Sequence, residues 1–95
     1  MKLLYTPEAI DDLQRLRAFI ETKNPEAAAR IGRNLIQEIS KLKTLPYIGR
    51  KVAKAPNPEV VRDLSIDSYI VRYLVLNEEV HVLRIWHKRE NWANK

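Results

Sequence analysis

The sequence predicts an α+β fold in which an antiparallel two-helix hairpin packs on an antiparallel sheet. Two amphipathic segments with helical spacing of apolar residues follow each other in residues 7–45. Three segments rich in β-branched and aromatic residues then follow in residues 60–87, and a short apolar stretch precedes the first helix. Helices and sheets with one apolar side must cover each other, and 95 residues suffice for one such core. We therefore expect a single domain, residues 1–95, with an N-terminal strand, the hairpin and three C-terminal strands.

The first helix is marked at its start by a capping pattern. Leu3 to Tyr5 is apolar and predicts a strand, and Thr6, Pro7 and Glu8 then have the order of an N-cap, a first helical residue and an acid that complements the helix dipole. The helix is expected to end near Thr22. Its predicted apolar stripe is Ile10, Leu13, Leu16 and Ile20. The predicted solvent side carries Glu8, Asp11, Asp12 and Arg15.

The second helix begins with the same pattern, because Asn24 is a good cap and Pro25 suits the first helical position. The connection between the helices is then only two or three residues long, which predicts a tight antiparallel hairpin. Gly32 lies in mid-helix at a cost of about 1 kcal/mol relative to Ala, which predicts close packing against the first helix. The predicted apolar stripe is Ala28, Ile31, Leu35, Ile39 and Leu42.

Residues 45–61 hold three of the five prolines and one of the two glycines, so regular structure is expected to stop there. Apolar and basic residues alternate in this segment, whereas domain linkers are polar. The segment is therefore predicted to be a loop held against the core, with charged side chains in water.

The three predicted strands are antiparallel and span Val60 to Leu64, Tyr69 to Leu76 and Val80 to His87. A three-residue loop, residues 77–79, would join the last two. One face would then carry Tyr69, Val71, Tyr73, Val75, Leu83 and Ile85 toward the helices. The other face would carry Ile70, Arg72, Leu74, Val82, Arg84 and Trp86, a half-apolar basic surface suited to a partner. A two-residue loop would shift this parity and separate Arg72 from Arg84.

Composition limits the function classes. Seventeen Lys and Arg against twelve Asp and Glu give a charge of +5, which favours an anionic partner, although solubility alone also explains such an excess. The chain has no cysteine and no apolar run near the length of a membrane span, so a cytoplasmic location is expected. His81 and His87 have no other ligand-type residue at a suitable spacing, and there is no Gly-rich phosphate loop. We expect no metal and no cofactor.

A metal-free ribonuclease is one chemistry that the residues allow. Such an enzyme needs a base for the ribose 2′-hydroxyl, an acid for the leaving oxygen and cations for the phosphorane. The candidates are His87, Lys88, Arg89, Arg62, Arg72 and Arg84. Basic residues at strand ends are also commonly solvated or bound to a protein partner. Trp86 and Trp92 suit stacking on bases or anchoring a peptide helix.

The order of elements and several motifs resemble the RelE/ParE superfamily of bacterial toxins from type II toxin–antitoxin pairs. The motifs are AIDDL, NPEAAARI, LPYIGR, VVRDL, YIVRY and VLRIWHKR, spread over nearly the whole chain. The resemblance implies either a RelE-like toxin that cleaves messenger RNA in the ribosome or a ParE-like toxin that poisons DNA gyrase. RelE-like nucleases carry an arginine after the aromatic residue that opens the penultimate strand, where this chain has Ile70.

The long helical hairpin and the lost arginine favour the ParE-like interpretation, a gyrase poison that is not an enzyme. Arg89 and His87 match positions of the nuclease pattern, so a RelE-like ribonuclease using His87, Lys88, Arg89 and Arg62 remains the alternative. An inactive relative that only binds antitoxin is a further alternative. The resemblance also implies a cognate antitoxin whose acidic amphipathic C-terminal segment wraps the toxin. The residues expected to bind antitoxin or target are Arg62, Arg72, Arg84, Trp86, His87, Lys88, Arg89 and Trp92.

Overall fold

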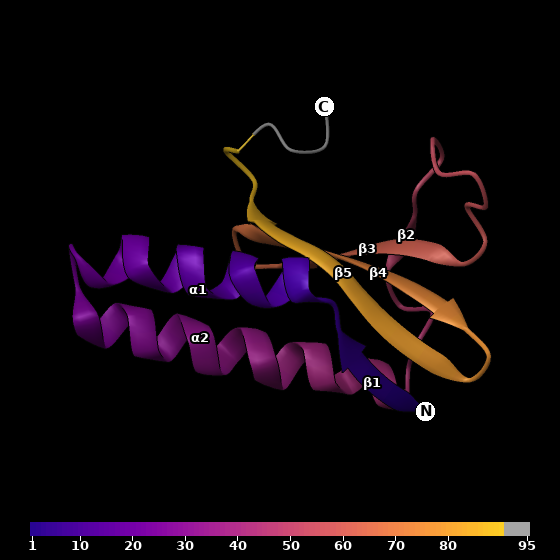
Figure 1. Cartoon of the computed structure of the whole chain (residues 1–95), viewed down its shortest axis with the longest axis horizontal. Coiled ribbons are helices and arrows are strands. Elements are labelled where there is room, and N and C mark those ends of the chain that lie inside the picture. Colours follow the sequence, from indigo (N-terminus) through magenta and orange to yellow (C-terminus); the bar gives the residue numbers. More distant parts are fainter. Residues whose placement is uncertain (91–95) are drawn as a thin grey trace.

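The helical hairpin lies against one face of a five-stranded sheet and extends beyond it (Figure 1). The computed structural model describes residues 1–90. The α+β architecture predicted from the sequence is confirmed, with an N-terminal strand, two helices and three long C-terminal strands. The elements in chain order are β1 (Lys2–Tyr5), α1 (Pro7–Glu21), α2 (Pro25–Ser40), a 3₁₀ turn (Lys41–Lys43), β2 (Arg50–Lys51), β3 (Val61–Ile66), β4 (Tyr69–Leu76) and β5 (Glu79–His87).

Both predicted helix caps are formed. The Thr6 hydroxyl accepts a hydrogen bond of 3.0 Å from the backbone N–H of Ala9, and the Asn24 side-chain oxygen accepts one of 3.1 Å from Ala27. Each cap satisfies a backbone donor that has no partner within its helix. The helices are joined only by residues 22–24, so they run side by side and antiparallel (Figure 1).

The sheet has the strand order β1-β5-β4-β3-β2. The three C-terminal strands are antiparallel, whereas β1 pairs in parallel with β5, so the complete sheet is mixed. The segment predicted as a loop contributes the two-residue strand β2 to the opposite edge. Gly49 anchors this segment: its N–H donates a 2.9 Å hydrogen bond to the buried Tyr73 hydroxyl. A Cβ at position 49 would lie 2.7 Å from the same hydroxyl oxygen, so the close approach requires glycine.

The predicted three-residue loop between β4 and β5 is wrong. Asn77 and Glu78 alone form the turn, and both have positive φ, 54° and 60°, as in the two-residue turns that match strand twist. A bulge then inserts Leu83 as an extra residue between two register pairs, Tyr73 with Val82 and Arg72 with Arg84. The shorter turn exchanges the sheet faces on which the first residues of β5 lie. The bulge restores the predicted faces from Arg84 onward. Consequently Arg84 remains opposite Arg72, but Val82 faces the helices.

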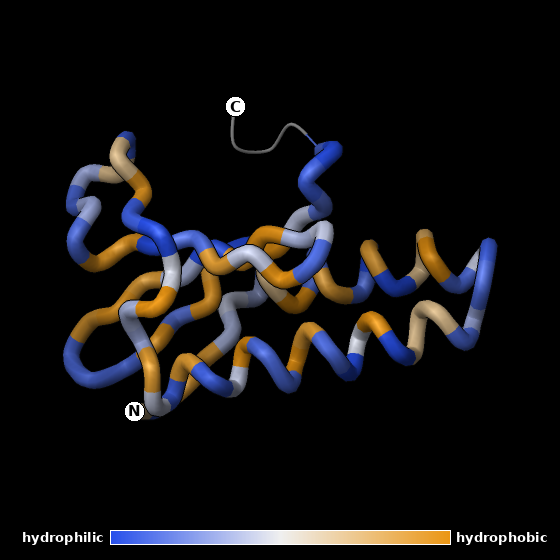
Figure 2. Tube along the Cα trace, turned by 180° about the vertical axis from the view of Figure 1, so that it is seen from behind, coloured by the Kyte–Doolittle hydropathy of each residue, from blue (hydrophilic) through white to orange (hydrophobic). Residues whose placement is uncertain are grey.

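The core lies between the sheet and the hairpin, and hydrophobic and hydrophilic residues alternate along the elements that enclose it (Figure 2). Ile10, predicted in the apolar stripe of α1, is 44% exposed. Gly32 does not pack closely against α1 as predicted, because a Cβ there would meet nothing within 4 Å. Among residues 1–90, no helix is long and apolar enough to cross a membrane. The buried sheet residues on the helix side are Tyr69, Val71, Tyr73, Val75, Val80, Val82 and Ile85. The buried helical residues that meet them are Ala9, Leu16, Leu35, Ile39 and Leu42.

Asp12 is buried, contrary to the prediction that it faces solvent, with only 3% of its surface exposed. Strand β1 pairs with β5 only as far as Val82, so the following part of β5 has no strand on that side. The Thr6 hydroxyl donates to the Leu83 carbonyl at 2.9 Å, and the Asp12 carboxylate accepts from the Ile85 N–H at 2.9 Å. Thr6 and Asp12 follow β1 in the sequence, and their side chains therefore hydrogen-bond to the backbone of β5 beyond the point where β1 ends.

The same carboxylate forms a two-point ion pair with Arg84, through contacts of 2.8 and 3.1 Å. Burial alone would raise the pKa of Asp12. The hydrogen bonds from Arg84 and Ile85, with the positive charges of Arg84 and Arg15, outweigh burial and hold the pKa below its ordinary value. Asp12 is therefore ionised at neutral pH.

We expect Asp12→Asn to lower the free energy of unfolding at pH 7 by about 1–3 kcal/mol, because Arg84 loses its charged partner. A depressed carboxyl pKa stabilises the fold at pH values above the unfolded-state pKa of about 4, and this contribution is lost as the pH falls through the lower folded-state value. The difference in free energy of unfolding between the wild type and the variant should therefore become smaller in acid. Urea unfolding at pH 7 and pH 3 measures both effects. Asp11→Asn, at an exposed neighbouring position, is the control. An equal loss for both variants would contradict the assignment.

Candidate functional site

Arg72 lies on the sheet face opposite the helices and is paired within the chain. Its guanidinium forms two hydrogen bonds to the Asp63 carboxylate, at 2.8 and 2.9 Å, across the β3 and β4 register pair. The same guanidinium lies over the Trp86 ring, 5.1 Å from its centroid. Two-point pairing with a carboxylate and stacking on an aromatic ring fix both the position and the direction of the charge.

Trp86, predicted from the sequence as an antitoxin- or target-binding residue, is 4% exposed in the chain. Its register partner Ile70 and the guanidinium of Arg72 lie on the same sheet face. A ring covered in this way contributes mainly to stability. The structure thus places Trp86 inside the folded chain.

Arg62 holds the segment between α2 and β3 in place. Its guanidinium donates to the carbonyls of Tyr47, Gly49 and Glu59 at 3.2–3.3 Å, and it lies 5.0 Å from the centre of the Tyr47 ring. Arg84 is likewise bound to Asp12. The three arginines of the predicted site, Arg62, Arg72 and Arg84, are therefore all engaged with groups of the chain itself.

His87 lies at the end of β5 on the helix side. Its ring contacts Tyr69 edge to face, with centroids 5.2 Å apart and planes at 87°. Its Nδ1 accepts a 3.1 Å hydrogen bond from the Arg89 backbone N–H, so the proton of the neutral imidazole is on Nε2. Burial raises the pKa of the Tyr69 phenol, and the carboxylate of Glu90 raises it further. Tyr69 is therefore a neutral hydroxyl.

A cleft of 600 Å³, here called the terminal cleft, lies between α1 and the end of β5. Phe19 is 63% exposed there, with the Lys23 ammonium 4.6 Å from its ring centre. Arg15 pairs with Glu90 at 2.8 Å across the cleft. The lining residues are Arg15, Leu16, Phe19, Ile20, Lys23, Tyr69, His87, Arg89 and Glu90. An aromatic and cationic lining of this kind suits an anionic partner.

Lys88 and Arg89 follow β5 with exposed side chains that form no ion pair with residues 1–90. Arg89 lines the terminal cleft, whereas Lys88 lines a second hollow, on the sheet face opposite the helices. Ile70 and Asp63 also line that hollow. The two cations therefore point to different sides of the sheet. Trp92, the last predicted site residue, lies outside the described residues.

The structure brings only part of the predicted site together. His87 and Arg89 share the terminal cleft, while Arg62 and Arg72 serve other contacts at the far side of the sheet. Sequence reasoning missed Asp12, although its spacing of three and four residues from Ala9 and Leu16 places it on the buried stripe of α1. Within residues 1–90 no group of three His, Cys, Asp or Glu side chains is arranged to hold a metal ion.

Comparison with known proteins gives consistent matches along nearly the whole chain. The family model described as "ParE toxin of type II toxin-antitoxin system, parDE" matches residues 3–92. "Toxin RelE1" of Caulobacter vibrioides is 35% identical over 92 residues, which cover 93% of this chain and 94% of the relative. "Toxin RelE2" of the same organism is 33% identical over 86 residues, covering 90% and 93%.

A solved structure, "Chromosomal ParDE TA system from P. aeruginosa", matches the fold with a TM-score of 0.78. The superposition covers 92% of this chain and 95% of that chain, at 21% sequence identity. The strand, hairpin and sheet arrangement is therefore shared with a chain of that system.

We expect Trp86→Ala to lower the free energy of unfolding by about 3 kcal/mol, because a covered aromatic ring is removed and Arg72 loses its stacking partner. Trp86→Phe should retain most of the stability. Chemical unfolding of both variants measures the difference. Unchanged stability of the alanine variant, together with weaker antitoxin binding, would restore the interpretation of Trp86 as an interface residue.

Proposed function

The chain belongs to the ParE toxin family of type II toxin–antitoxin systems, and from that premise we propose that it poisons DNA gyrase. We also propose that a cognate antitoxin neutralises it. The family match and the curated relatives support a toxin of the ParE/RelE group. The choice of gyrase depends on the residues where a nuclease would need its catalytic groups.

The observation that carries this proposal is the aliphatic side chain of Ile70 itself, in the hollow that Lys88 also lines. Ile70 stands where the nuclease pattern requires a guanidinium, and an aliphatic side chain cannot donate a hydrogen bond to a phosphorane. The nearby guanidinium of Arg72 is fixed on Asp63 by two hydrogen bonds. Loss of one preorganised donor commonly lowers a rate by about 10²–10³. These features support a mode of action that is not phosphodiester cleavage.

The hydrogen bonding of His87 supports the same conclusion. A general base that takes the ribose proton needs an imidazole nitrogen with a free lone pair. The Nδ1 of His87 already accepts from Arg89, and Nε2 carries the proton of the neutral ring. In this arrangement His87 can donate a hydrogen bond but has no lone pair available for a substrate hydroxyl.

Ribosome-dependent cleavage of messenger RNA is the second candidate function. Two relatives are named as RelE toxins, and His87 and Arg89 line one cleft beside the exposed Lys88. In this alternative Arg89 would stabilise the phosphorane, and the doubly protonated ring of His87 would donate its Nε2 proton to the leaving oxygen. Lys88 lines a different hollow and would have to turn to the same side of the sheet to contribute. Arg62 would have to leave the three carbonyls that it now binds. A chain that only binds antitoxin is the third candidate.

Two assays at matched concentrations of antitoxin-free protein distinguish these functions. We expect inhibition of gyrase supercoiling with accumulation of cleaved DNA, and intact messenger RNA on translating ribosomes. Cleaved transcripts with normal supercoiling would contradict the gyrase proposal and assign catalysis to His87, Lys88 and Arg89. No effect in either assay, from protein that is folded by circular dichroism, would identify an inactive toxin.

We expect the double variant Lys88→Glu and Arg89→Glu to inhibit gyrase at least about tenfold less than the wild type, because exposed cations at the sheet end favour a DNA-bound target. Both side chains are exposed, so the melting temperature should change little. The combination of Lys43→Glu and Lys54→Glu, two exposed charge reversals away from the end of β5, is the matched control. Equal inhibition by the double variant and the control would exclude this end of the sheet as the target contact.

A further inference from the structure

The chain turns directly after β5, and residues 88–90 are here called the end turn. The Lys88 N–H donates to the Ser68 carbonyl at 2.8 Å, which ties the start of the turn to the segment between β3 and β4. The Arg89 N–H donates to the Nδ1 of His87 at 3.1 Å, and the Glu90 N–H donates to the His87 carbonyl at 2.8 Å. These last two bonds stay within residues 87–90. They shape the end turn, but they do not fix it to another element.

Glu90 joins the end turn to α1 through its carboxylate. One oxygen, Oε1, accepts a 3.1 Å hydrogen bond from the backbone N–H of His87. The other oxygen, Oε2, accepts a 2.8 Å hydrogen bond from the Arg15 guanidinium. Because hydrogen bonds between charged groups are directional, this contact defines where the turn lies relative to the helix.

Arg15 is in turn held by the core. Its guanidinium lies 3.5 Å from the carboxylate of Asp12, one helical turn earlier. Asp12 is buried and binds Arg84 on β5. Opposite charges therefore alternate from Arg84 through Asp12 and Arg15 to Glu90. This series connects the packed sheet to the end turn through a rigid helix.

The end turn determines where its two cations point. Lys88 lines the hollow on the sheet face opposite the helices, whereas Arg89 lines the terminal cleft. A cation on a mobile segment loses conformational freedom when it binds, and a cation that is already held does not. The pair of Arg15 with Glu90 is partly exposed, so it contributes little to the stability of the fold. Its main effect is therefore on the orientation of the turn.

We propose that Arg15 is a positioning residue for the target contact. Through its ion pair with Glu90, it holds the end turn in the orientation that binds the target. This inference rests on the proposed function, which places the target contact at Lys88 and Arg89. It gives an acidic side chain, Glu90, a favourable role in binding a target that includes DNA.

The sign of the Glu90 effect distinguishes positioning from simple attraction between charges. Glu90→Gln removes a negative charge beside two exposed cations. Attraction alone would then make the variant a stronger inhibitor of gyrase, because DNA is an anion. Positioning predicts the opposite result. We expect inhibition of supercoiling to become at least about threefold weaker, because the end turn is no longer held in advance.

Variants of Arg15 complete the test of the ion pair. Arg15→Gln should weaken inhibition as Glu90→Gln does, and the double variant should lose no more than either single variant, because the pair is already broken. Arg15→Lys keeps the charge and should restore part of the inhibition. The melting temperature should change little in all four proteins.

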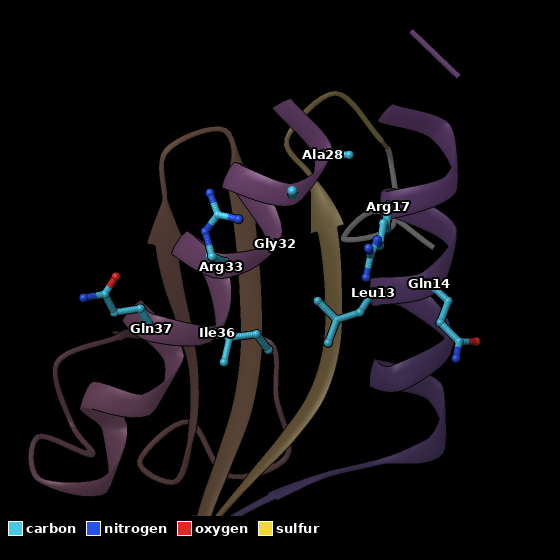
Figure 3. Close-up of a pocket in the computed structure, with 9 residues that line it drawn as sticks. Leu13, Gln14, Arg17, Ala28, Gly32, Arg33, Ile36 and Gln37 are labelled. Carbon is cyan, nitrogen blue, oxygen red and sulfur yellow. The ribbon is translucent and has the colours of Figure 1, made fainter. Parts of the chain in front are cut away.

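The matched controls break another exposed ion pair of α1. Arg17 and Glu21 are 3.5 Å apart, so Arg17→Gln and Glu21→Gln repeat the two charge changes at a different place. Arg17 lines a pocket between α1 and α2, away from the end turn (Figure 3). Both controls should inhibit gyrase as the wild type does.

The motion of the end turn gives a readout that does not depend on the target. Relaxation of ¹⁵N nuclei in the free chain measures the order parameter of each backbone amide. We expect values of about 0.85 for Arg89 and Glu90 in the wild type, and values below about 0.6 in Arg15→Gln. Arg17→Gln should keep the wild-type values.

The other outcomes overturn the inference in distinguishable ways. Unchanged order parameters in Arg15→Gln would mean that the end turn holds itself, and Arg15 would have no positioning role. Equal or stronger inhibition by folded Glu90→Gln would assign the effect of this end to charge alone. A wild-type chain that does not inhibit gyrase would overturn the proposed function and, with it, the role of Arg15 in target contact.

Discussion

The ion pair between Asp12 and Arg84 determines how the helical hairpin meets the sheet. The Asp12 carboxylate occupies the edge of β5 at the point where β1 ends, and it binds both the Arg84 guanidinium and the Ile85 N–H. A buried carboxylate must keep its charged partner, so α1 cannot slide or rotate along the sheet without a large penalty. The three-residue connection then carries the same constraint to α2. The position of the hairpin on the sheet follows from this one contact.

Internal pairing also determines which positive charges remain for partners. Arg62 binds loop carbonyls, Arg72 binds Asp63, and Arg84 binds Asp12. These guanidinium groups hold the sheet, its edge and the adjoining segment together, and each would have to break internal hydrogen bonds to contact a ligand. Exposed cations instead occur at the end of β5 and along the helical hairpin. The positive charges that remain available to a partner are therefore those at the end of β5 and on the helical hairpin.

Local signals in the sequence were sufficient for the two helices and the three C-terminal strands, but not for β2. The caps at Thr6 and Asn24, each followed by proline, determine where the helices begin, because they act through neighbouring backbone groups. Alternating β-branched and aromatic residues likewise determine the three C-terminal strands. The family also follows from the sequence, because its motifs are spread along the chain.

Contacts between distant residues were decided only by the tertiary structure. The positive-φ turn at Asn77 and Glu78 and the bulge at Leu83 compensate each other, and no local pattern predicts that cancellation. The burial of Asp12 depends on a strand more than seventy residues away, and the pairing of Arg72 depends on Asp63 being its register partner. The sequence by itself determined the two helices, the strands β1, β3, β4 and β5, their order and the family. The tertiary structure decided which charged side chains are available to a partner, because side chains far apart in sequence neutralise one another only after folding.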